Sequence, residues 1–449
     1  MRLDWEPVDG EWPTKREFKV LDSEGKVVEV IGTNPTLEEL RASERKFGKR
    51  FDLLESDLIC VECENLIEYR FSANSEGELL CWDCATQQES NSETHIQTNV
   101  DPTKAVLSES KLHEKSLCDH VINVATGCRH GCKFCYVPTT PAVETRDEML
   151  AEQANVDDPQ EDWGSYLLYR DDLPERLRRE LKDRDFENDW KRTERGRGVV
   201  MLSSGTDCYQ DRRAAQITRG CVQELIEHDI PVRILTRSPA VTRDIDLFKE
   251  AGDLITVGSS IPSFDAELVR AIEPGAPPPK ARWRALDQLQ KEGIPVYVSF
   301  SPTYPLMTKY EIDTMLGHFR ALGENVVVFH EPINPRGQNF EMLTAAAEEL
   351  GRPELVKAFE QLQDESQWVS YAVEQINLVQ QRAEKMYPGL EIHTWPDRLL
   401  VQKTSGELSK RLQAMREAVS PESFDGSSVN RDAAQSVLFE GPPERAELI

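Results

Sequence analysis

The stretch GCRHGCKFCY, residues 127–136, places three cysteines within eight residues at the spacing C-x3-C-x2-C. Cysteine thiolates are the usual ligands of iron–sulfur clusters, and the two glycines of the stretch supply the backbone freedom that a tight wrap needs. We therefore predict that Cys128, Cys132 and Cys135 hold a [4Fe–4S] cluster. Three ligands leave one iron open, and an open metal position is typical of a site that does chemistry. The alternative is a structural metal site or three unrelated thiols.

Outward from this stretch, short apolar runs alternate with long amphipathic stretches from about residue 118 onward. Alternating strands and helices indicate a parallel sheet. Six such units predict an α/β fold with a partial (βα)6 TIM-like barrel, in which active sites lie at the carboxyl ends of the strands. The expected strands are His120–Ala125, Val199–Ser203, Val232–Thr236, Leu254–Ser260, Val296–Phe300 and Val326–Phe329, with Ile392–Trp395 as a further candidate.

A polar segment from His330 to Asn339 follows the sixth expected strand and should face the same cavity as the cysteines. Polar side chains in that position can orient a substrate, and the candidates are Glu331, Asn334 and Arg336. The alternative is that they only hold the loop together.

Four more cysteines form two pairs near the N-terminus, in the pattern C-x2-C-x17-C-x2-C. Two such pairs bring four thiolates to one tetrahedral ion, so Cys60, Cys63, Cys81 and Cys84 predict a structural zinc in a small β-rich, zinc-ribbon-like module. A redox dithiol pair and an auxiliary iron cluster are the alternatives that this spacing leaves open.

Composition and patterning divide the chain into five segments. Residues 1–50 are expected to form a β-hairpin and helix, and residues 51–100 the zinc-ribbon-like module with a linker. The barrel spans residues 101–345 and a helical extension residues 346–415. The polar residues 416–449 are expected to lack a fixed structure.

The net charge of −27 disfavours non-specific attraction to phosphate backbones, which bind lysine and arginine. The apolar runs are too short to span a bilayer, and the N-terminus has no apolar signal-peptide core. We expect a soluble, cytoplasmic protein with no membrane partner. Clustered cysteines then point to metal rather than to disulfides.

The cysteine stretch resembles the signature of the radical S-adenosylmethionine (SAM) superfamily, which has an aromatic residue before the last cysteine, here Phe134. Further motifs in the same order resemble the branch of spore photoproduct lyase and its DNA repair photolyase-like relatives. They span about residues 105–339 and leave the N-terminal cysteines outside. They are TDCYQ at 206–210, TRS at 236–238, and EPGAP at 273–277 followed by Arg282.

The resemblance implies a mechanism. The open iron binds the amino and carboxylate groups of SAM, and an external one-electron donor of the flavodoxin or ferredoxin type reduces the cluster. Reductive cleavage gives methionine and a 5′-deoxyadenosyl radical, which abstracts a hydrogen atom from the substrate. The protein positions the reactants and excludes water.

The resemblance also implies roles for individual residues. Arg237 stands where the branch usually has lysine and would contact the SAM carboxylate. The guanidinium of arginine can form two parallel hydrogen bonds with a carboxylate, whereas the ammonium of lysine acts as a point charge. Thr206 and its neighbours would hold the amino or ribose groups. Tyr136 would lie near the adenine, with core packing as its alternative. The full SAM-binding prediction comprises Phe134, Tyr136, Ser204, Thr206, Asp207, Arg237 and Ser260.

Two positions depart from the branch. Ser204 occupies the place of the lyase's hydrogen-donor cysteine, which counts against thymine-dimer reversal. Cys208 replaces a proline of the branch and is a candidate radical-relay thiol. Its alternative is a small buried hydrophobic residue.

Three functions follow as hypotheses. The first is a radical SAM enzyme acting on a nucleic-acid base, against which the acidic charge and Ser204 both count. The second is radical SAM modification of a protein, peptide or small molecule. The third is a non-catalytic protein that uses its iron and zinc sites to bind partners. Production of 5′-deoxyadenosine separates the third from the others.

Overall fold

The computed structural model describes residues 96–115, 117–182 and 198–418, together with short strands between residues 2 and 81. The chain divides into two compact units, Met1–His95 and Ile96–Ile449. The zinc prediction lies outside the described residues, since Cys60, Cys63 and Cys84 are not described and Cys81 is described only as the end of a strand. The helix expected within residues 1–50 and the tail beyond residue 418 also lie outside them.

The first unit contains antiparallel strands. Strand β2 pairs with both β1 and β3, and β2 and β3 are the hairpin that the sequence indicates. Two shorter hairpins pair β4 with β5 and β6 with β7. The bounds are β1 Arg2–Pro7, β2 Arg16–Leu21, β3 Val27–Thr33, β4 Leu58–Ile59, β5 Leu66–Ile67, β6 Phe71–Ala73 and β7 Leu79–Cys81.

The larger sheet of the second unit has the strand order β18-β17-β16-β15-β14-β13-β10-β9. In this sheet all neighbours from β10 to β18 are parallel, and β9 at its edge pairs antiparallel with β10. The predicted α/β partial barrel is confirmed, and β18 extends it beyond the six expected units. The bounds are β9 Ser108–Glu109, β10 His120–Ile122, β13 Val200–Leu202, β14 Val232–Thr236, β15 Ile255–Ser260, β16 Val296–Thr303, β17 Val327–Pro332 and β18 Glu391–Thr394.

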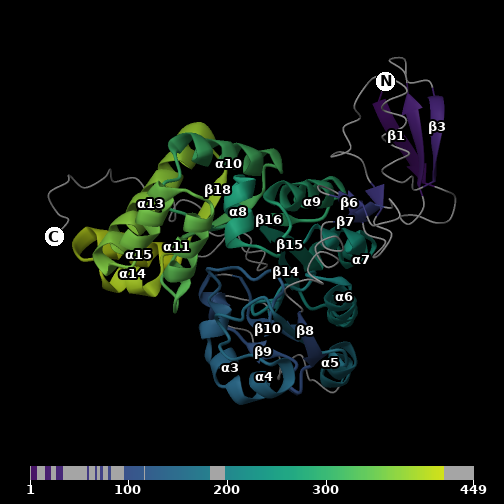
Figure 1. Ribbon diagram of the computed structural model, residues 1–449, viewed down its shortest axis with the longest axis horizontal. Helices are drawn as coiled ribbons and strands as arrows, with labels where there is room; N and C mark the ends of the chain where they lie inside the picture. Colours follow the sequence, from purple (N-terminus) through teal and green to yellow (C-terminus); the bar gives the residue numbers. More distant parts are fainter. Residues whose placement is uncertain are drawn as a thin grey trace. The chain divides into compact units, whose positions relative to one another are not determined.

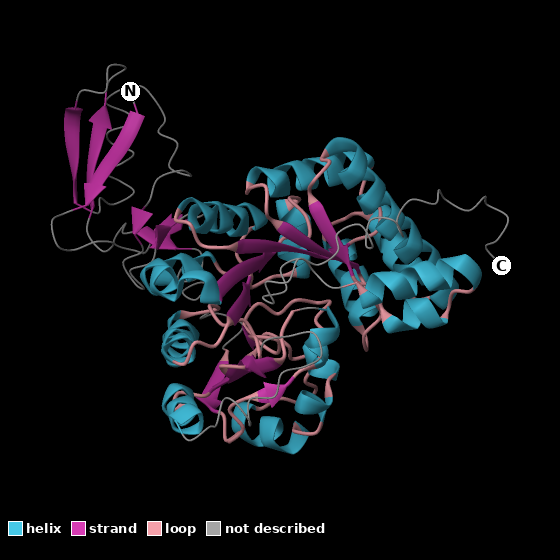
Figure 2. Ribbon diagram, turned by 180° about the vertical axis from the view of Figure 1, so that it is seen from behind, coloured by secondary structure: helices cyan, strands magenta, loops and turns pink. Residues whose placement is uncertain are grey.

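Helices cover the outer face of this sheet, as Figures 1 and 2 show. Because side chains alternate along a strand, one set of positions packs under the helices and the other lines the barrel interior. On β14, Val232 and Ile234 belong to the core beneath the helices, whereas Arg233 stacks on the rings of Tyr297 and Phe329 inside the barrel. The covering helices are α5 Leu173–Lys182, α6 Arg212–Glu227, α7 Ile245–Ala251, α9 Pro279–Lys291, α10 Lys309–Ala321 and α13 Glu365–Met386.

A second hydrophobic core lies among the C-terminal helices. Its largest side chain, Trp368 on α13, is fully buried and donates from Nε1 to the backbone oxygen of Ile333, 2.9 Å away. This bond ties the loop after β17 to the helical layer, and that loop carries the predicted substrate residues. The remaining helices of this layer are α8 Ala266–Ile272, α11 Asn339–Glu349, α12 Pro353–Gln361, α14 Arg398–Gln402 and α15 Gly406–Glu417.

A smaller sheet of order β11-β12-β8 lies beside the barrel. The strand expected over His120–Ala125 is split between the two sheets, because β10 ends at Ile122 and β11 begins at Ala125. The side chain of the intervening Asn123 accepts hydrogen bonds from the loop after β13. This part of the chain comprises β8 Gln97–Val100, β11 Ala125–Thr126, β12 Tyr166–Tyr169, α3 Pro141–Glu144, α4 Asp147–Ala154 and the 3-10 turns η1 Lys111–Lys115 and η2 Val137–Thr139. The 3-10 turns η3 Pro239–Asp244 and η4 Gly252–Leu254 flank α7, between β14 and β15 of the barrel.

None of the helices in the described ranges combines the length and apolarity that crossing a membrane would require.

The barrel wall contains a buried histidine whose protonation should set part of the pH dependence of stability. His330 on β17 is 1% exposed, and burial lowers its pKa from 6.5 to about 3. Between these values the unfolded chain binds the proton and the folded chain does not. The free energy of unfolding should therefore fall by about 1.4 kcal/mol per pH unit as the pH drops below 6.5.

Replacing His330→Phe should remove this contribution, because the ring already packs beside Phe300 and the new side chain cannot titrate. Chemical denaturation at several pH values between 4 and 6 measures the slope, and the variant should show the shallower one. Thr303→Val is the matched control, since it removes the 3.2 Å contact to His330 Nε2 but keeps the histidine. Equal slopes for wild type and His330→Phe would contradict the expectation.

Candidate functional site

The three predicted cluster cysteines lie on the loop after β11. All three are free thiols, with Cys128 and Cys132 buried and Cys135 half-buried. Burial raises the pKa of Cys128 and of Cys135 to about 12, and in both groups the charge of another cysteine of the trio raises it further. The pKa of Cys132 rises for the same reasons. A pocket that disfavours bare thiolates this strongly requires a cationic group to hold them deprotonated.

The donor set fits an iron–sulfur cluster, whose usual ligands are cysteine thiolates. Within the described ranges, no group of three His, Cys, Asp or Glu side chains is placed to hold one metal ion. A four-iron cluster binds its thiolates at separate iron corners, so its ligands lie further apart than those of a mononuclear site. Cys128, Cys132 and Cys135 are the residues that would hold it.

Close backbone contacts hold this loop. Gly127 has φ +89°, and a Cβ there would lie 2.1 Å from the backbone oxygen of Tyr166 on β12. On the other side, Gly275 donates its N–H to the backbone oxygen of His130 at 3.0 Å. Lys133 donates to the backbone oxygen of Ile272, the last residue of α8, at 2.9 Å. The loop is therefore held between β12 and the segment 272–275.

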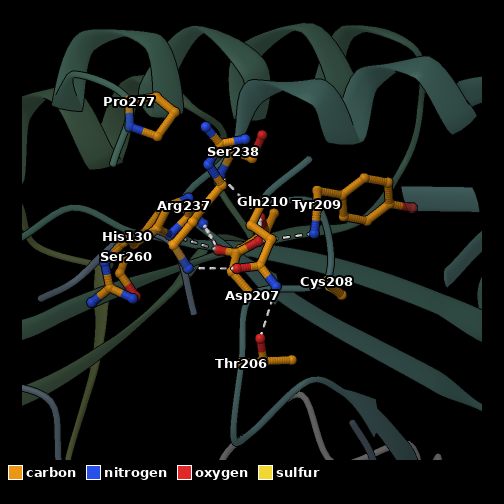
Figure 3. A network of polar contacts seen from close by, with 12 residues as sticks. His130, Thr206, Asp207, Cys208, Tyr209, Gln210, Arg237, Ser238, Ser260 and Pro277 are labelled. Carbon is orange, nitrogen blue, oxygen red and sulfur yellow. Dashed lines mark hydrogen bonds and ion pairs between the residues drawn. The ribbon is translucent and has the colours of Figure 1, made fainter. Parts of the chain in front are cut away.

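A buried carboxylate connects the loops after β13 and β14 to the cysteine loop (Figure 3). Asp207 is 4% exposed and accepts bonds from the hydroxyl of Thr236 at 2.6 Å and the backbone N–H of Arg237 at 2.7 Å. It also accepts from the backbone N–H of Tyr209 at 2.9 Å, and its Oδ2 lies 3.5 Å from Nδ1 of His130. Burial lowers the pKa of His130 to about 4, so this contact involves a neutral imidazole at pH 7. Asp207 thus holds the site together, in addition to the SAM contact that the sequence predicts for it.

Thr206 is engaged with the cysteine loop. Its hydroxyl donates to the backbone oxygen of Gly127 at 2.6 Å and accepts from the side chain of Gln210 at 2.9 Å. The other amide atom of Gln210 accepts from the backbone N–H of Arg129 at 2.8 Å. Gln210 was not among the predicted site residues, although it ends the TDCYQ motif that pointed to its neighbours.

Asn123 is a second residue that sequence reasoning missed. Its Oδ1 accepts from the backbone N–H groups of Ser204 at 3.0 Å and Gly205 at 2.7 Å, which shapes the loop after β13. The available signal was an asparagine inside an otherwise apolar part of the expected strand His120–Ala125. A polar residue there has several common roles, so the sequence did not single it out.

Arg237 lies in a buried group of charges next to the cysteine loop. Its Nε donates to Glu273 at 3.1 Å, and its guanidinium carbon lies 5.5 Å from the centre of the Phe134 ring. Arg282 forms an ion pair with the same carboxylate at 2.6 Å and donates to the backbone oxygen of Ser260 at 2.9 Å. Burial alone would raise the pKa of Glu273, but the two guanidinium groups outweigh it and lower that pKa.

Tyr136 contacts the loop after β13. The residue is 45% exposed, and its hydroxyl donates to the backbone oxygen of Ser204 at 3.0 Å. The other predicted residues, Glu331, Asn334 and Arg336, lie at the end of β17 and in the loop that follows it.

The residues of that loop are paired with one another and with distant segments. Glu331 accepts from Lys115 on η1 and from Asn334, both at 2.8 Å. Arg336 forms an ion pair with Asp397 after β18. Their role in orienting a substrate stays a prediction.

Cys208 lies away from the predicted cavity. It is fully buried in the core beneath the helices, and its thiol donates to the backbone oxygen of Leu202 at 3.4 Å. Burial raises its pKa well above the usual value. This is the surrounding of a small buried hydrophobic residue, and its role as a radical relay stays a prediction.

The sequence matches the family model described as the radical SAM superfamily over residues 122–322. An uncharacterized protein of the Acidianus two-tailed virus is 30% identical over 250 residues, which cover 54% of this chain and 77% of the viral protein. The chain belongs to the radical SAM superfamily. Membership implies a [4Fe–4S] cluster and SAM as cofactors, and this chain's buried trio of thiols fits the cluster.

Other relatives and solved structures align at lower sequence identity. An uncharacterized protein of Methanocaldococcus jannaschii is 29% identical over 187 residues, covering 41% of this chain and 61% of that protein. A spore photoproduct lyase complexed with dinucleoside spore photoproduct aligns at 14% identity and a TM-score of 0.46, over 79% of this chain and 93% of that one. Streptococcus suis SuiB bound to S-adenosylmethionine aligns at 13% identity and a TM-score of 0.32, over 71% of this chain and 55% of that one.

The contact between Gly275 and the cysteine loop gives a test of this radical SAM site. In Gly275→Ala the new Cβ would lie 2.1 Å from the backbone oxygen of Arg129, so the loop or the segment 272–275 must shift. We expect a loss of about 1–3 kcal/mol in the free energy of unfolding and a lower iron content after anaerobic reconstitution.

Gly205→Ala is the control, because its Cβ would approach only the movable side chain of Asn123, at 3.3 Å. Iron and sulfide analysis together with urea denaturation measure both effects. A Gly275→Ala protein with wild-type iron content and stability would show that the contact does not hold the loop.

Proposed function

We propose that this protein uses a [4Fe–4S] cluster held by Cys128, Cys132 and Cys135 to cleave SAM reductively and to abstract a hydrogen atom from a substrate. The observation that carries the proposal is three free thiols, two buried and one half-buried, on one loop that bonds to Thr206 after β13 and to the segment 272–275. When bound, the cluster supplies the electron that converts SAM into methionine and a 5′-deoxyadenosyl radical.

The residues of the chain would bind and orient SAM around this loop. The guanidinium of Arg237 is fixed beside the cysteine loop by Glu273 and by its backbone bond to Asp207, where it can pair with a carboxylate. Ser204 offers its hydroxyl on a backbone held by Asn123. Arg282 holds the backbone of Ser260, so that strand end is rigid as well. Preorganised groups of this kind lower the cost of binding a charged cofactor.

We take a nucleic-acid base as the first substrate class to test. The motifs at 206–210, 236–238 and 273–277 resemble those of the lyase branch, which acts on such a base. The net charge of −27 counts against a phosphate-binding surface. Ser204 stands where the lyase has its hydrogen-donor cysteine, which counts against donation of a hydrogen atom to the substrate as in the lyase. A protein, peptide or small molecule is therefore the alternative, and a flavodoxin- or ferredoxin-type protein would supply the electron.

The decisive experiment is anaerobic reconstitution with iron and sulfide, reduction, and detection of 5′-deoxyadenosine by mass spectrometry. The wild-type protein should form it, and Cys132→Ala should reduce its formation at least 100-fold, because the cluster loses one of three ligands. Cys221→Ala is the matched control, since Cys221 is a free, buried thiol on α6, away from the loop. Zinc in place of iron at the loop, or equal turnover in Cys132→Ala, would overturn the proposal.

The substrate class is addressed by the salt dependence of DNA and RNA binding and by deuterated SAM. A base-acting enzyme should bind nucleic acid with an affinity that falls steeply with salt. An affinity that does not change with salt concentration would exclude a phosphate-binding groove. It would favour a protein, peptide or small molecule as the substrate. Transfer of deuterium between SAM and a component of a cell extract would then identify the substrate.

A further inference from the structure

A fully buried carboxylate belongs to the segment that bonds to the cysteine loop on both sides of Cys132. Glu273 is 0% exposed and stands between Ile272 and Gly275, whose backbone groups form these bonds. Their partners are Lys133 and His130, at 2.9 and 3.0 Å. The backbone of the segment that carries Glu273 is therefore fixed against the cysteine loop.

Two guanidinium groups share this carboxylate. Glu273 Oε2 lies 3.1 Å from Arg237 Nε and 2.6 Å from Arg282 Nη2, and the hydroxyl of Tyr304 lies 3.4 Å from Oε1. Arg282 is 0% exposed and the side chain of Arg237 is 19% exposed. Two positive charges and one negative charge leave this buried group with a net charge of +1.

The charges lie close enough to the loop to act on its sulfur atoms. The guanidinium carbon of Arg237 is 5.5 Å from the Phe134 ring centre, which places it beside the segment between Cys132 and Cys135. Charges in such a poorly hydrated place are weakly screened.

We propose that Arg237 and Glu273 set the reduction potential of the cluster with opposite signs, with Glu273 also fixing the guanidinium that meets SAM. This inference rests on the proposed function. Reduction adds one electron to the cluster without a proton, so the reduced state carries one more negative charge. Arg237 stabilises that state and Glu273 destabilises it, so removing either charge shifts the potential in a direction known in advance.

Anaerobic redox titration of the reconstituted full-length protein, without SAM, tests the inference through the spectrum of the cluster. Glu273→Gln should raise the potential, and Arg237→Gln should lower it. Each should change the reduction equilibrium about tenfold, which is about 59 mV for one electron. If Glu273→Gln does not fold, Arg237→Gln suffices, because it leaves the pair of Glu273 and Arg282 intact.

Two further variants separate charge from geometry. Arg237→Lys should keep the reduction potential near that of the wild type, because the positive charge remains. It should raise the KM for SAM, because lysine lacks the two-pronged guanidinium that can bind a carboxylate with two hydrogen bonds. Arg382→Gln removes a positive charge that pairs with Asp313 on α10, away from the cysteine loop, and should leave the potential unchanged.

The experiments distinguish a failure of the proposed function from a failure of the inference on the reduction potential. A wild-type protein that binds no [4Fe–4S] cluster overturns the proposed function, and this inference with it. A protein that binds the cluster but shows the same potential in wild type, Arg237→Gln and Glu273→Gln overturns the inference alone. An equal shift in Arg382→Gln would also overturn it, because the effect would then follow from net charge rather than from position.

Discussion

The buried carboxylate of Asp207 is the constraint on which the site depends. Burying an ionised carboxylate is costly unless its oxygens are fully hydrogen-bonded. Asp207 meets this condition by accepting from Thr236, Arg237 and Tyr209, which belong to the ends of two neighbouring strands. Its proximity to His130 links both strand ends to the cysteine loop. Three segments far apart in sequence are in this way held at one end of the barrel.

The same principle explains why the second carboxylate, Glu273, is tolerated at zero exposure. Arg237 and Arg282 pay its desolvation cost, and the backbone bonds of Ile272 and Gly275 fix its segment against the loop. Charged side chains, and not only the backbone of the barrel, therefore form the surroundings of the cysteine loop. A cluster in such a surrounding takes part of its redox behaviour from neighbours that are not its ligands.

Much of the barrel could be predicted because its signals are local. Val232–Thr236 is an apolar run between helical stretches, and it forms β14 with the expected bounds. The apolar run His120–Ala125 predicts one strand, but the structure divides it between two sheets. An apolar stretch does not show which sheet each of its residues joins. Its division into β10 and β11 follows from pairing with β13 on one side and β12 on the other. Such pairing depends on residues distant along the chain.

By itself, the sequence determined the superfamily and predicts which three cysteines hold the cluster, because their spacing is local and a cluster requires thiolates within a short loop. Only the tertiary structure decided the surroundings of those cysteines. It fixed the segment of Glu273 against the cysteine loop, engaged Thr206 with Gly127, and buried Cys208 under the helices. The physical reason is that these contacts join residues some 80 to 140 positions apart or depend on which face of a strand end is covered, and no local pattern encodes either.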